Sequence, residues 1–264
     1  MSGVALAATL HDPGCADLAA TVGAAEDLAR LYAGMVIFAT EETPGRALGP
    51  LVAAGARVTT HPSEYREIGW RRLGAVREAA MLAPAVHLCD FDRLLHWWRC
   101  RRDELVATVA RIPSCDLLLL GRTERAWATH PAHQLDTEQL ANRLVSRLFG
   151  AEVDVCSGSR GLSRRAVEYL AAHGRVRDVG TDGEWPMLLR RAQEGFRCEQ
   201  VLTEGLEFET ADRFPDEVAR AGGLAAWNAA RDREVDRWVF RTRLAGDIVA
   251  GRCARRGSET GRHE

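Results

Sequence analysis

Two aspartates separated by one residue, Asp90 and Asp92, directly follow the apolar run 85–89. That run predicts a buried strand, and open α/β sheets bind ligands at the carboxyl ends of such strands. Two carboxylates this close repel each other, and burial raises their pKa values unless a cation neutralises them. Their oxygens suit Mg2+ or Mn2+, which proteins commonly hold together with substrate phosphates. The pattern predicts a divalent cation site, and the alternative is an acidic turn with Arg93 or Arg99 as ion-pair partner.

The elements that would position these aspartates follow an alternating pattern. Short apolar runs alternate with longer helical patterns, which predicts strand–helix–strand units. The fold class is therefore α/β, with a single Rossmann-like, mostly parallel sheet flanked by helices. Strands are predicted at 4–10, 35–40, 57–60, 85–89, 116–121, 152–156 and 199–209. Helices are predicted at 16–32, 46–54, 67–82, 102–111, 137–149, 163–173, 181–194 and 227–252, with loops at 122–133 and 157–161.

Composition excludes several classes of protein. The formal net charge of the 264 residues is -2, so no global basic field would attract nucleic acid or an anionic membrane. All 35 basic residues are Arg, so phosphate contacts must come from guanidinium groups, backbone N–H groups or a metal. Seven scattered cysteines predict reduced thiols. No apolar run is long enough to span a membrane, and the first ten residues lack a secretory signature, which predicts a cytoplasmic protein.

At this point the chain resembles a known family. A Rossmann-like first half, followed by an apolar strand that ends in Asp-x-Asp, is similar to family-2-like glycosyltransferases of the GT-A fold, which use nucleotide-diphosphosugars. The resemblance covers roughly residues 4–214, and Asp90-Phe91-Asp92 is its closest motif match. It implies that Asp90 and Asp92 bind the cation, with Asp90 also on the ribose side. It implies as well that Thr9, His11 and Asp12 contact the nucleotide, and that Arg71 or Arg72 approaches the diphosphate.

A second part of the resemblance lies downstream. Family members carry an acidic motif at the start of a helix, and Asp182 and Glu184 occupy that place here. The resemblance implies that one of them is the catalytic base or orients the acceptor; the alternative is that Asp182 caps the helix. Trp185 either stacks on a sugar or packs in the core, because indole does both. Acceptor contacts are expected from the preceding loop, at Ser159 and Arg160.

The sequence also departs from the family. The segment 39–43 reads Ala-Thr-Glu-Glu-Thr where members carry an acidic nucleoside contact, and no His follows His173 until His263 to act as a late metal ligand. A carboxylate from the run 205–212 could replace that ligand. Its alternating pattern, however, favours a strand with a solvated acidic face.

The resulting hypothesis is a Mg2+- or Mn2+-dependent glycosyltransferase that moves a sugar from a nucleoside diphosphate to an acceptor. One alternative is a non-catalytic binding protein that keeps the fold. A sugar-phosphate nucleotidylyltransferase is less favoured, because residues 9–16 lack a Gly-rich basic loop. We expect residues 1–214 to form the nucleotide-sugar and acceptor domain, 215–256 a helical extension, and 257–264 a disordered tail.

Overall fold

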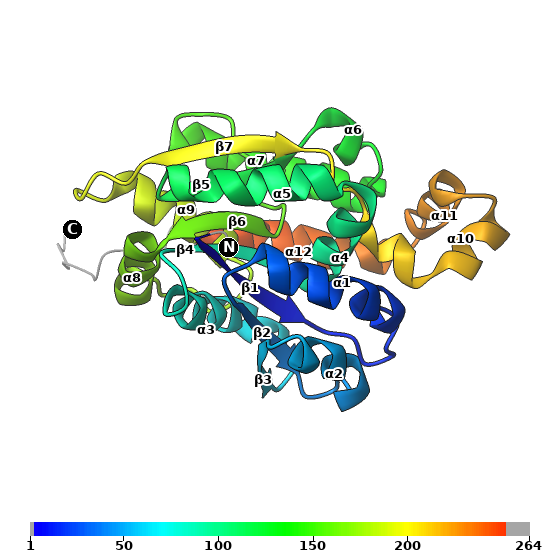
Figure 1. Cartoon of the computed structure of the whole chain (residues 1–264). Coiled ribbons are helices and arrows are strands. Elements are labelled where there is room, and N and C mark those ends of the chain that lie inside the picture. Colours follow the sequence, from blue (N-terminus) through cyan, green and yellow to red (C-terminus); the bar gives the residue numbers. More distant parts are fainter. Residues whose placement is uncertain (1–2, 252–264) are drawn as a thin grey trace, which may run out of the picture.

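The computed structural model describes residues 3–251 and contains a single mixed sheet flanked by helices (Figure 1). The seven strands are arranged in the order β3-β2-β1-β4-β6-β5-β7. Their bounds are β1 Val4–Leu10, β2 Met35–Thr40, β3 Arg57–His61, β4 Ala85–Asp90, β5 Leu117–Arg122, β6 Ser159–Ser163 and β7 Cys198–Thr203. All pairs are parallel except those of β6, which runs antiparallel between β4 and β5. The predicted mostly parallel α/β sheet is confirmed.

Helices cover both faces of the sheet, which is why the central strands are apolar on both sides. One face carries α1 Leu18–Leu31, α2 Gly45–Ala53, α4 Phe91–Cys100 and α5 Arg102–Arg111. The other carries α3 Ile68–Ala80, α7 Ala132–Phe149, α8 Arg164–His173, α9 Thr181–Arg191 and α12 Val235–Gly251. The last of these, α12, packs on α7 and α9 and adds Ala245 and Ile248 to the core.

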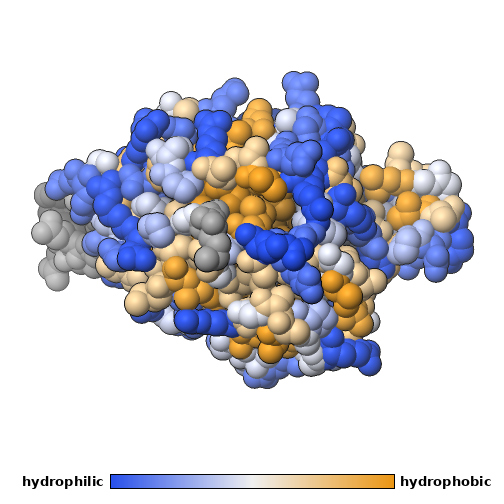
Figure 2. Space-filling model, in the orientation of Figure 1, coloured by the Kyte–Doolittle hydropathy of each residue, from blue (hydrophilic) through white to orange (hydrophobic). Residues whose placement is uncertain are grey.

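Short elements connect this framework. They are α6 Glu124–Trp127, α10 Pro215–Ala221, α11 Leu224–Arg231 and the 3-10 turns η1 Tyr65–Glu67, η2 Ile112–Ser114 and η3 Glu209–Arg213. Helices α10 and α11 project as a lobe at one side of the molecule, and hydrophobic and hydrophilic residues mix on its visible surface (Figures 1 and 2). Within residues 3–251, no helix combines the length and apolarity that crossing a bilayer requires. The expected tail at 257–264 lies outside the described residues.

Five local predictions are wrong, and one of them is the single helix at 227–252, which is divided into α11 and α12. Residues 152–156 form no strand, because side chains of Ser146, Asn142 and Gln200 take their backbone N–H groups. The strand at this point is β6, which includes part of the predicted loop 157–161. The predicted loop 122–133 contains α6 and the start of α7. The predicted strand 199–209 ends at Thr203, so the run 205–212 has no solvated strand face.

Helix α4 begins at Phe91, so Asp92 lies in its first turn rather than in a free acidic turn. Its apolar face explains why the helix forms here: Phe91, Leu94 and Trp97 are fully buried against the sheet. Asp90 is the N-cap residue, with extended backbone angles. The helix therefore fixes Asp90 at the strand end and Asp92 on the adjoining helical turn. The two aspartates have different neighbours as a result.

Candidate active site

The carboxyl ends of β1, β2 and β4 meet at one edge of the sheet. Thr9 lies opposite Asp90 in the parallel register, and its hydroxyl donates a 2.8 Å hydrogen bond to Asp90 Oδ1. Next to them, Nδ1 of the exposed His11 lies 2.8 Å from Thr40 Oγ1. The structure thus brings Thr9, His11 and Asp90 to the edge where α/β sheets bind ligands.

Asp12 organises the loop after β1. Its carboxylate accepts the backbone N–H groups of Ala16 at 2.8 Å and Asp17 at 3.0 Å, and its own N–H donates to Thr43 Oγ1 at 3.0 Å. The side chain is buried. Both carboxylate oxygens are therefore engaged by the chain itself, and Asp12 shapes the predicted nucleotide loop from within.

Arg72 of α3 joins two acidic side chains that are far apart in sequence. Its Nη2 donates to Asp90 Oδ2 at 2.8 Å, and its Nη1 donates to Asp182 Oδ1 at 3.0 Å. Arg160 Nη2 also bonds to Asp182 Oδ1. The side chains of Arg72 and Asp182 are only 6% and 4% exposed. We call Asp90, Arg72 and Asp182 the locked triad.

The locked triad gives two predicted site residues, Arg72 and Asp182, partners within the protein. Arg72 was expected at the diphosphate, but two carboxylates already take its terminal nitrogens. Asp182 was expected as base or helix cap, yet its oxygens accept from Arg72 and Arg160, and it makes no cap hydrogen bond to the start of α9. Arg71 is also engaged, because its Nη1 donates to the carbonyl of Pro62 at 2.7 Å.

Asp92 has a different environment. Its Oδ1 accepts the N–H of Arg93 at 2.9 Å, its Oδ2 lies 3.4 Å from Arg213 Nη2, and its side chain is 28% exposed. Burial and the charge of Glu209 raise the pKa of Asp92 to about 7, against the opposing effects of Arg213 and Arg93. By contrast, Arg72, Arg93 and the Thr9 hydroxyl overcome the effect of burial and lower the pKa of Asp90.

Glu209 of η3 comes from the run 205–212, from which a carboxylate was one of the two alternatives for a late metal ligand. It is buried, its Oε1 lies 3.7 Å from Arg93 Nε, and its Oε2 has no hydrogen-bond partner among the described residues. A strand was favoured for this run because of its alternating acidic residues. The signal that could have found Glu209 was the absence of a late His, which left a metal-ligand position open. We call Asp92 and Glu209 the open pair.

The residues at this edge have the oxygen chemistry that a divalent cation prefers, although their ligand atoms are not yet gathered within 4.8 Å of one another in the described structure. Burial is the largest cause of the raised pKa of Asp92, and Glu209 Oε2 has no hydrogen-bond partner among the described residues. Asp90, Asp92 and Glu209 offer the carboxylate oxygens that Mg2+ or Mn2+ prefers. Arg213 stands beside them, held by a 3.0 Å hydrogen bond from its Nε to Asp17. Its side chain is 20% exposed, against 6% for Arg72, so Arg213 is the more accessible of these two guanidinium groups.

A tight loop from the far half of the chain closes the back of the site. Ser157 accepts a 2.6 Å hydrogen bond from Arg93 Nη1 through its carbonyl. Gly158 has a φ of 68°, and a Cβ atom at this position would lie 2.7 Å from Asp90 Oδ2. Only glycine suits both the backbone angle and this close approach.

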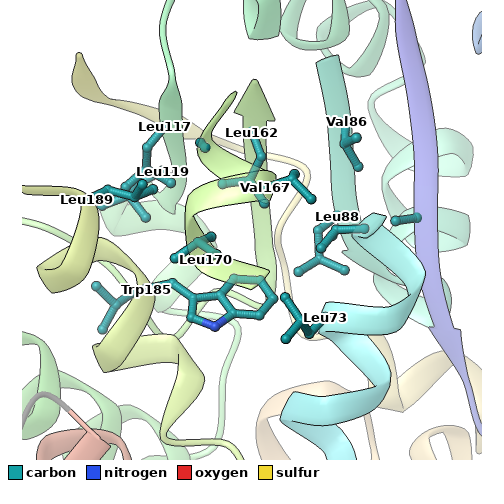
Figure 3. Close-up of a cluster of buried hydrophobic side chains, with 14 of the residues drawn as sticks. Leu73, Val86, Leu88, Leu117, Leu119, Leu162, Val167, Leu170, Trp185 and Leu189 are labelled. Atoms are coloured by element: carbon teal, nitrogen blue, oxygen red, sulfur yellow. The ribbon is translucent and has the colours of Figure 1, made fainter. Parts of the chain in front are cut away.

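The expected acceptor-side residues lie deeper than predicted. Ser159 Oγ is 2.9 Å from Nε2 of the fully buried His87, and Ser159 and Arg160 are each 1% exposed. Trp185 is also 1% exposed and packs among Leu73, Leu170 and other core side chains, as Figure 3 shows. Packing in the core, the alternative for this indole, is therefore correct. Neither Ser159 nor Trp185 offers a surface to a sugar.

Glu184 is oriented away from the locked triad. Its Oε1 accepts the backbone N–H groups of Arg175 at 2.8 Å and Val176 at 3.2 Å, so it fixes the loop between α8 and α9. Burial raises its pKa, and the two N–H donors oppose that effect. The carboxylate of Glu184 is bound by the backbone of its own loop, and its role as a catalytic base stays a prediction.

A histidine anchors the segment that carries Glu209. His96 of α4 lies with its Nδ1 2.6 Å from Asp212 and its Nε2 3.1 Å from Glu207. Burial lowers the pKa of His96, but the hydrogen bonds and charges of these two carboxylates outweigh it and raise the pKa. Cys100 lies close to His96 and Glu207, with all three ligand atoms within 4.8 Å of one another. The cluster ties η3 to α4 and so holds Glu209 next to Asp92.

Comparison with known proteins identifies the fold. Glucosyl-3-phosphoglycerate synthase from Mycobacterium tuberculosis, solved with Mn2+, uridine-diphosphate (UDP) and phosphoglyceric acid, matches with a TM-score of 0.55 at 15% identity, over 98% of this chain and 81% of that one. The complex with Mn2+, UDP-glucose and glycerol 3-phosphate gives 0.52 at 15% identity, over 98% and 83%. No protein-family model and no curated sequence matches. The chain has the GT-A fold of these nucleotide-sugar enzymes.

Proposed function

We propose that this protein is a divalent-cation-dependent glycosyltransferase that uses a nucleoside diphosphate sugar as donor. The observation that carries the proposal is the open pair, in which Asp92 and the orphaned oxygen of the buried Glu209 accompany Asp90 at the ligand-binding edge of a GT-A sheet. Structural neighbours with this fold were solved with Mn2+ and UDP or UDP-glucose, which supports the same donor class here. The acceptor is not part of this proposal.

In this proposal Asp90, Asp92 and Glu209 hold the cation. When bound, Mg2+ or Mn2+ supplies positive charge to the leaving diphosphate. Thr9 and Arg72 orient Asp90 through hydrogen bonds, so that one ligand is fixed before the donor arrives. Asp182 is a positioning residue, since it fixes Arg72 rather than contacting substrate.

Arginines and the first loop complete the donor site. Arg213 is proposed to contact the diphosphate, because it stands at the open pair with a partly exposed side chain. His11, exposed at the end of β1 and oriented by Thr40, is proposed to face the nucleoside. Fixed charges of this kind stabilise the developing charge of the leaving group without reorganisation, which is usually the largest catalytic contribution.

The test is thermal unfolding with UDP, with and without Mn2+, in the wild type, Asp92→Asn and Glu209→Gln. A ligand at 100 times its Kd stabilises the native state by about 2.7 kcal/mol. We expect UDP and Mn2+ together to raise the Tm of the wild type, and Asp92→Asn to remove the Mn2+-dependent part. Glu209→Gln should weaken the Mn2+-dependent affinity for UDP by about tenfold, which is the usual effect of losing one charged contact.

Glu78→Gln is the matched control, because Glu78 is exposed at the far end of α3 and its change removes the same charge. It should respond to UDP and Mn2+ as the wild type does. Equal Mn2+-dependent stabilisation of the wild type and Asp92→Asn would refute the cation site. Mn2+-dependent release of UDP from UDP-glucose by the wild type would distinguish an enzyme from a non-catalytic binding protein.

A further inference from the structure

A second polar cavity lies on the other side of the segment that carries Glu209. Its volume is about 120 Å3, and its lining includes His133, Gln134, Thr210, Arg231, Arg237 and Arg241. We call it the arginine cavity. Helix α7 contributes Gln134, η3 contributes Thr210, and the arginines come from the end of α11 and from α12. Three guanidinium groups from two helices thus converge on a space that holds a few water molecules or one small ionic group.

The positive charge of the arginine cavity is only partly neutralised. Arg241 Nη1 lies 3.2 Å from Glu138, and Arg237 Nε lies 2.8 Å from Glu234, whose side chain is 52% exposed. Arg231 has no carboxylate within ion-pair distance among residues 3–251, and it lies over the ring of Trp227 at 4.2 Å. Burial and the charge of Arg237 lower the pKa of Arg231. This environment favours an anion that would relieve the repulsion among the arginines.

Gln134 provides an independent indication of a ligand. It is only 1% exposed, and neither its Nε2 nor its Oε1 has a hydrogen-bond partner within the described chain. Arg231 Nε, which lines the same cavity, is also without a partner there. Buried polar atoms are nearly always hydrogen-bonded in native proteins, so three orphaned atoms around one cavity point to a missing polar group. The N–H atoms of Gln134 and Arg231 are donors that an oxyanion accepts.

The cavity is adjacent to the proposed cation site. Phe208 and Thr210 line it, while Glu209 between them belongs to the open pair and lies near Arg93. Successive residues of the segment 208–210 therefore contribute side chains to two sites of opposite charge, the arginine cavity and the proposed cation site. A ligand with an anionic group in the cavity could extend past Thr210 toward the cation edge.

We propose that the arginine cavity binds an oxyanion, a phosphate monoester or carboxylate, and that this group belongs to the acceptor. The assignment to the acceptor rests on the proposed function. The binding of the anion does not, because it follows from the three arginines, the orphaned donors and the size of the cavity.

The first experiment titrates inorganic phosphate into the wild type by calorimetry, at constant ionic strength. We expect saturable binding that Arg231→Gln and Gln134→Glu each weaken by about tenfold or more, since one removes a charged donor and the other adds a repelling charge. Arg220→Gln is the control, because Arg220 is exposed on α10 and does not line the cavity. Equal phosphate affinity in all four proteins would overturn the proposal.

The second experiment separates the cavity from the donor site. Phosphate and UDP with Mn2+ should bind the wild type together, and UDP affinity should change less than twofold in Arg231→Gln, which also shows that the variant is folded. If UDP displaces the phosphate, the anion occupies the donor site and the cavity proposal fails. If UDP and Mn2+ do not bind but phosphate binding still depends on Arg231, the proposed function fails and the anion site stands.

A third series uses glycerol 3-phosphate and glycerol, which differ only by the phosphate group. Glycerol 3-phosphate should bind with the same dependence on Arg231 and without displacing UDP, whereas glycerol should not bind at millimolar concentration. Equal binding of the two compounds would show that no anion is recognised and would overturn the proposal.

Discussion

Asp90 and Asp92 are separated by one residue, and the structure gives them opposite environments. Asp90 is bonded to Thr9 and Arg72, and these contacts lower its pKa. Asp92 faces Glu209, and its pKa rises to about 7. The locked triad therefore has its charges paired within the protein, while the open pair retains charge that a ligand can neutralise. The two members of an acidic doublet can therefore differ: Asp90 is held in a fixed orientation by hydrogen bonds from the protein, whereas Asp92 is paired more loosely.

The largest effect should come from breaking the locked triad with Arg72→Met. This change leaves Asp90 and the buried Asp182 without their shared partner, and losing one member of a buried ion pair destabilises by about 3–5 kcal/mol. Urea unfolding measures the loss. The matched variant is Arg71→Met, because Arg71 is the next residue and donates only to a backbone carbonyl. It should lose only about 1.5 kcal/mol of the free energy of unfolding. Combining Arg72→Met with Asp182→Asn should recover part of the stability, and strict additivity would contradict the triad.

A smaller effect is expected at the point where the loop after α7 meets Asp90. Gly158→Ala adds a Cβ atom at a position with a left-handed backbone angle and brings it into contact with Asp90 Oδ2. Together, these two effects should lower the free energy of unfolding by roughly 1–3 kcal/mol. Gly150→Ala is matched in angle, with a φ of 82°, but has no atom within 4 Å of the added Cβ. We expect only Gly158→Ala to weaken Mn2+-dependent UDP binding as well. Identical effects of both variants would mean that Gly158 is required for its backbone angle alone.

The remaining effect is the pH dependence of the open pair. Protonated Asp92 cannot bind a cation, so Mn2+ affinity should rise by about tenfold per pH unit up to pH 7 and level off above it. The stability of the metal-free protein changes in the opposite direction. Because folding raises the pKa of the Asp92 carboxyl, this group stabilises the folded state at pH values below its unfolded pKa of 3.8, and that stabilisation is lost as the pH rises toward 7. Metal-free wild type should thus lose stability relative to Asp92→Asn between pH 5 and 8. Parallel curves would refute the raised pKa.

Much of the first half of the fold could be predicted from local pattern. The buried strands at 4–10 and 35–40 and the position of Asp90 at a strand end follow from apolar runs that are covered on both faces. Prediction failed where side chains replaced the expected backbone pairing. Residues 152–156 are extended in sequence pattern, but Asn142 and Gln200 satisfy their N–H groups, and the strand forms at Ser159–Ser163 instead.

The alternation of strands and helices, the all-arginine set of basic residues and the acidic doublet at the end of a buried strand could be read from the chain directly, because each is encoded within a few neighbouring residues. Which charges pair depends on the three-dimensional arrangement of the elements. Arg72 reaches Asp182 across 110 positions, and the η3 segment brings Glu209 to Asp92. Long side chains choose partners by distance in space and by burial, and neither is contained in the local pattern of the chain.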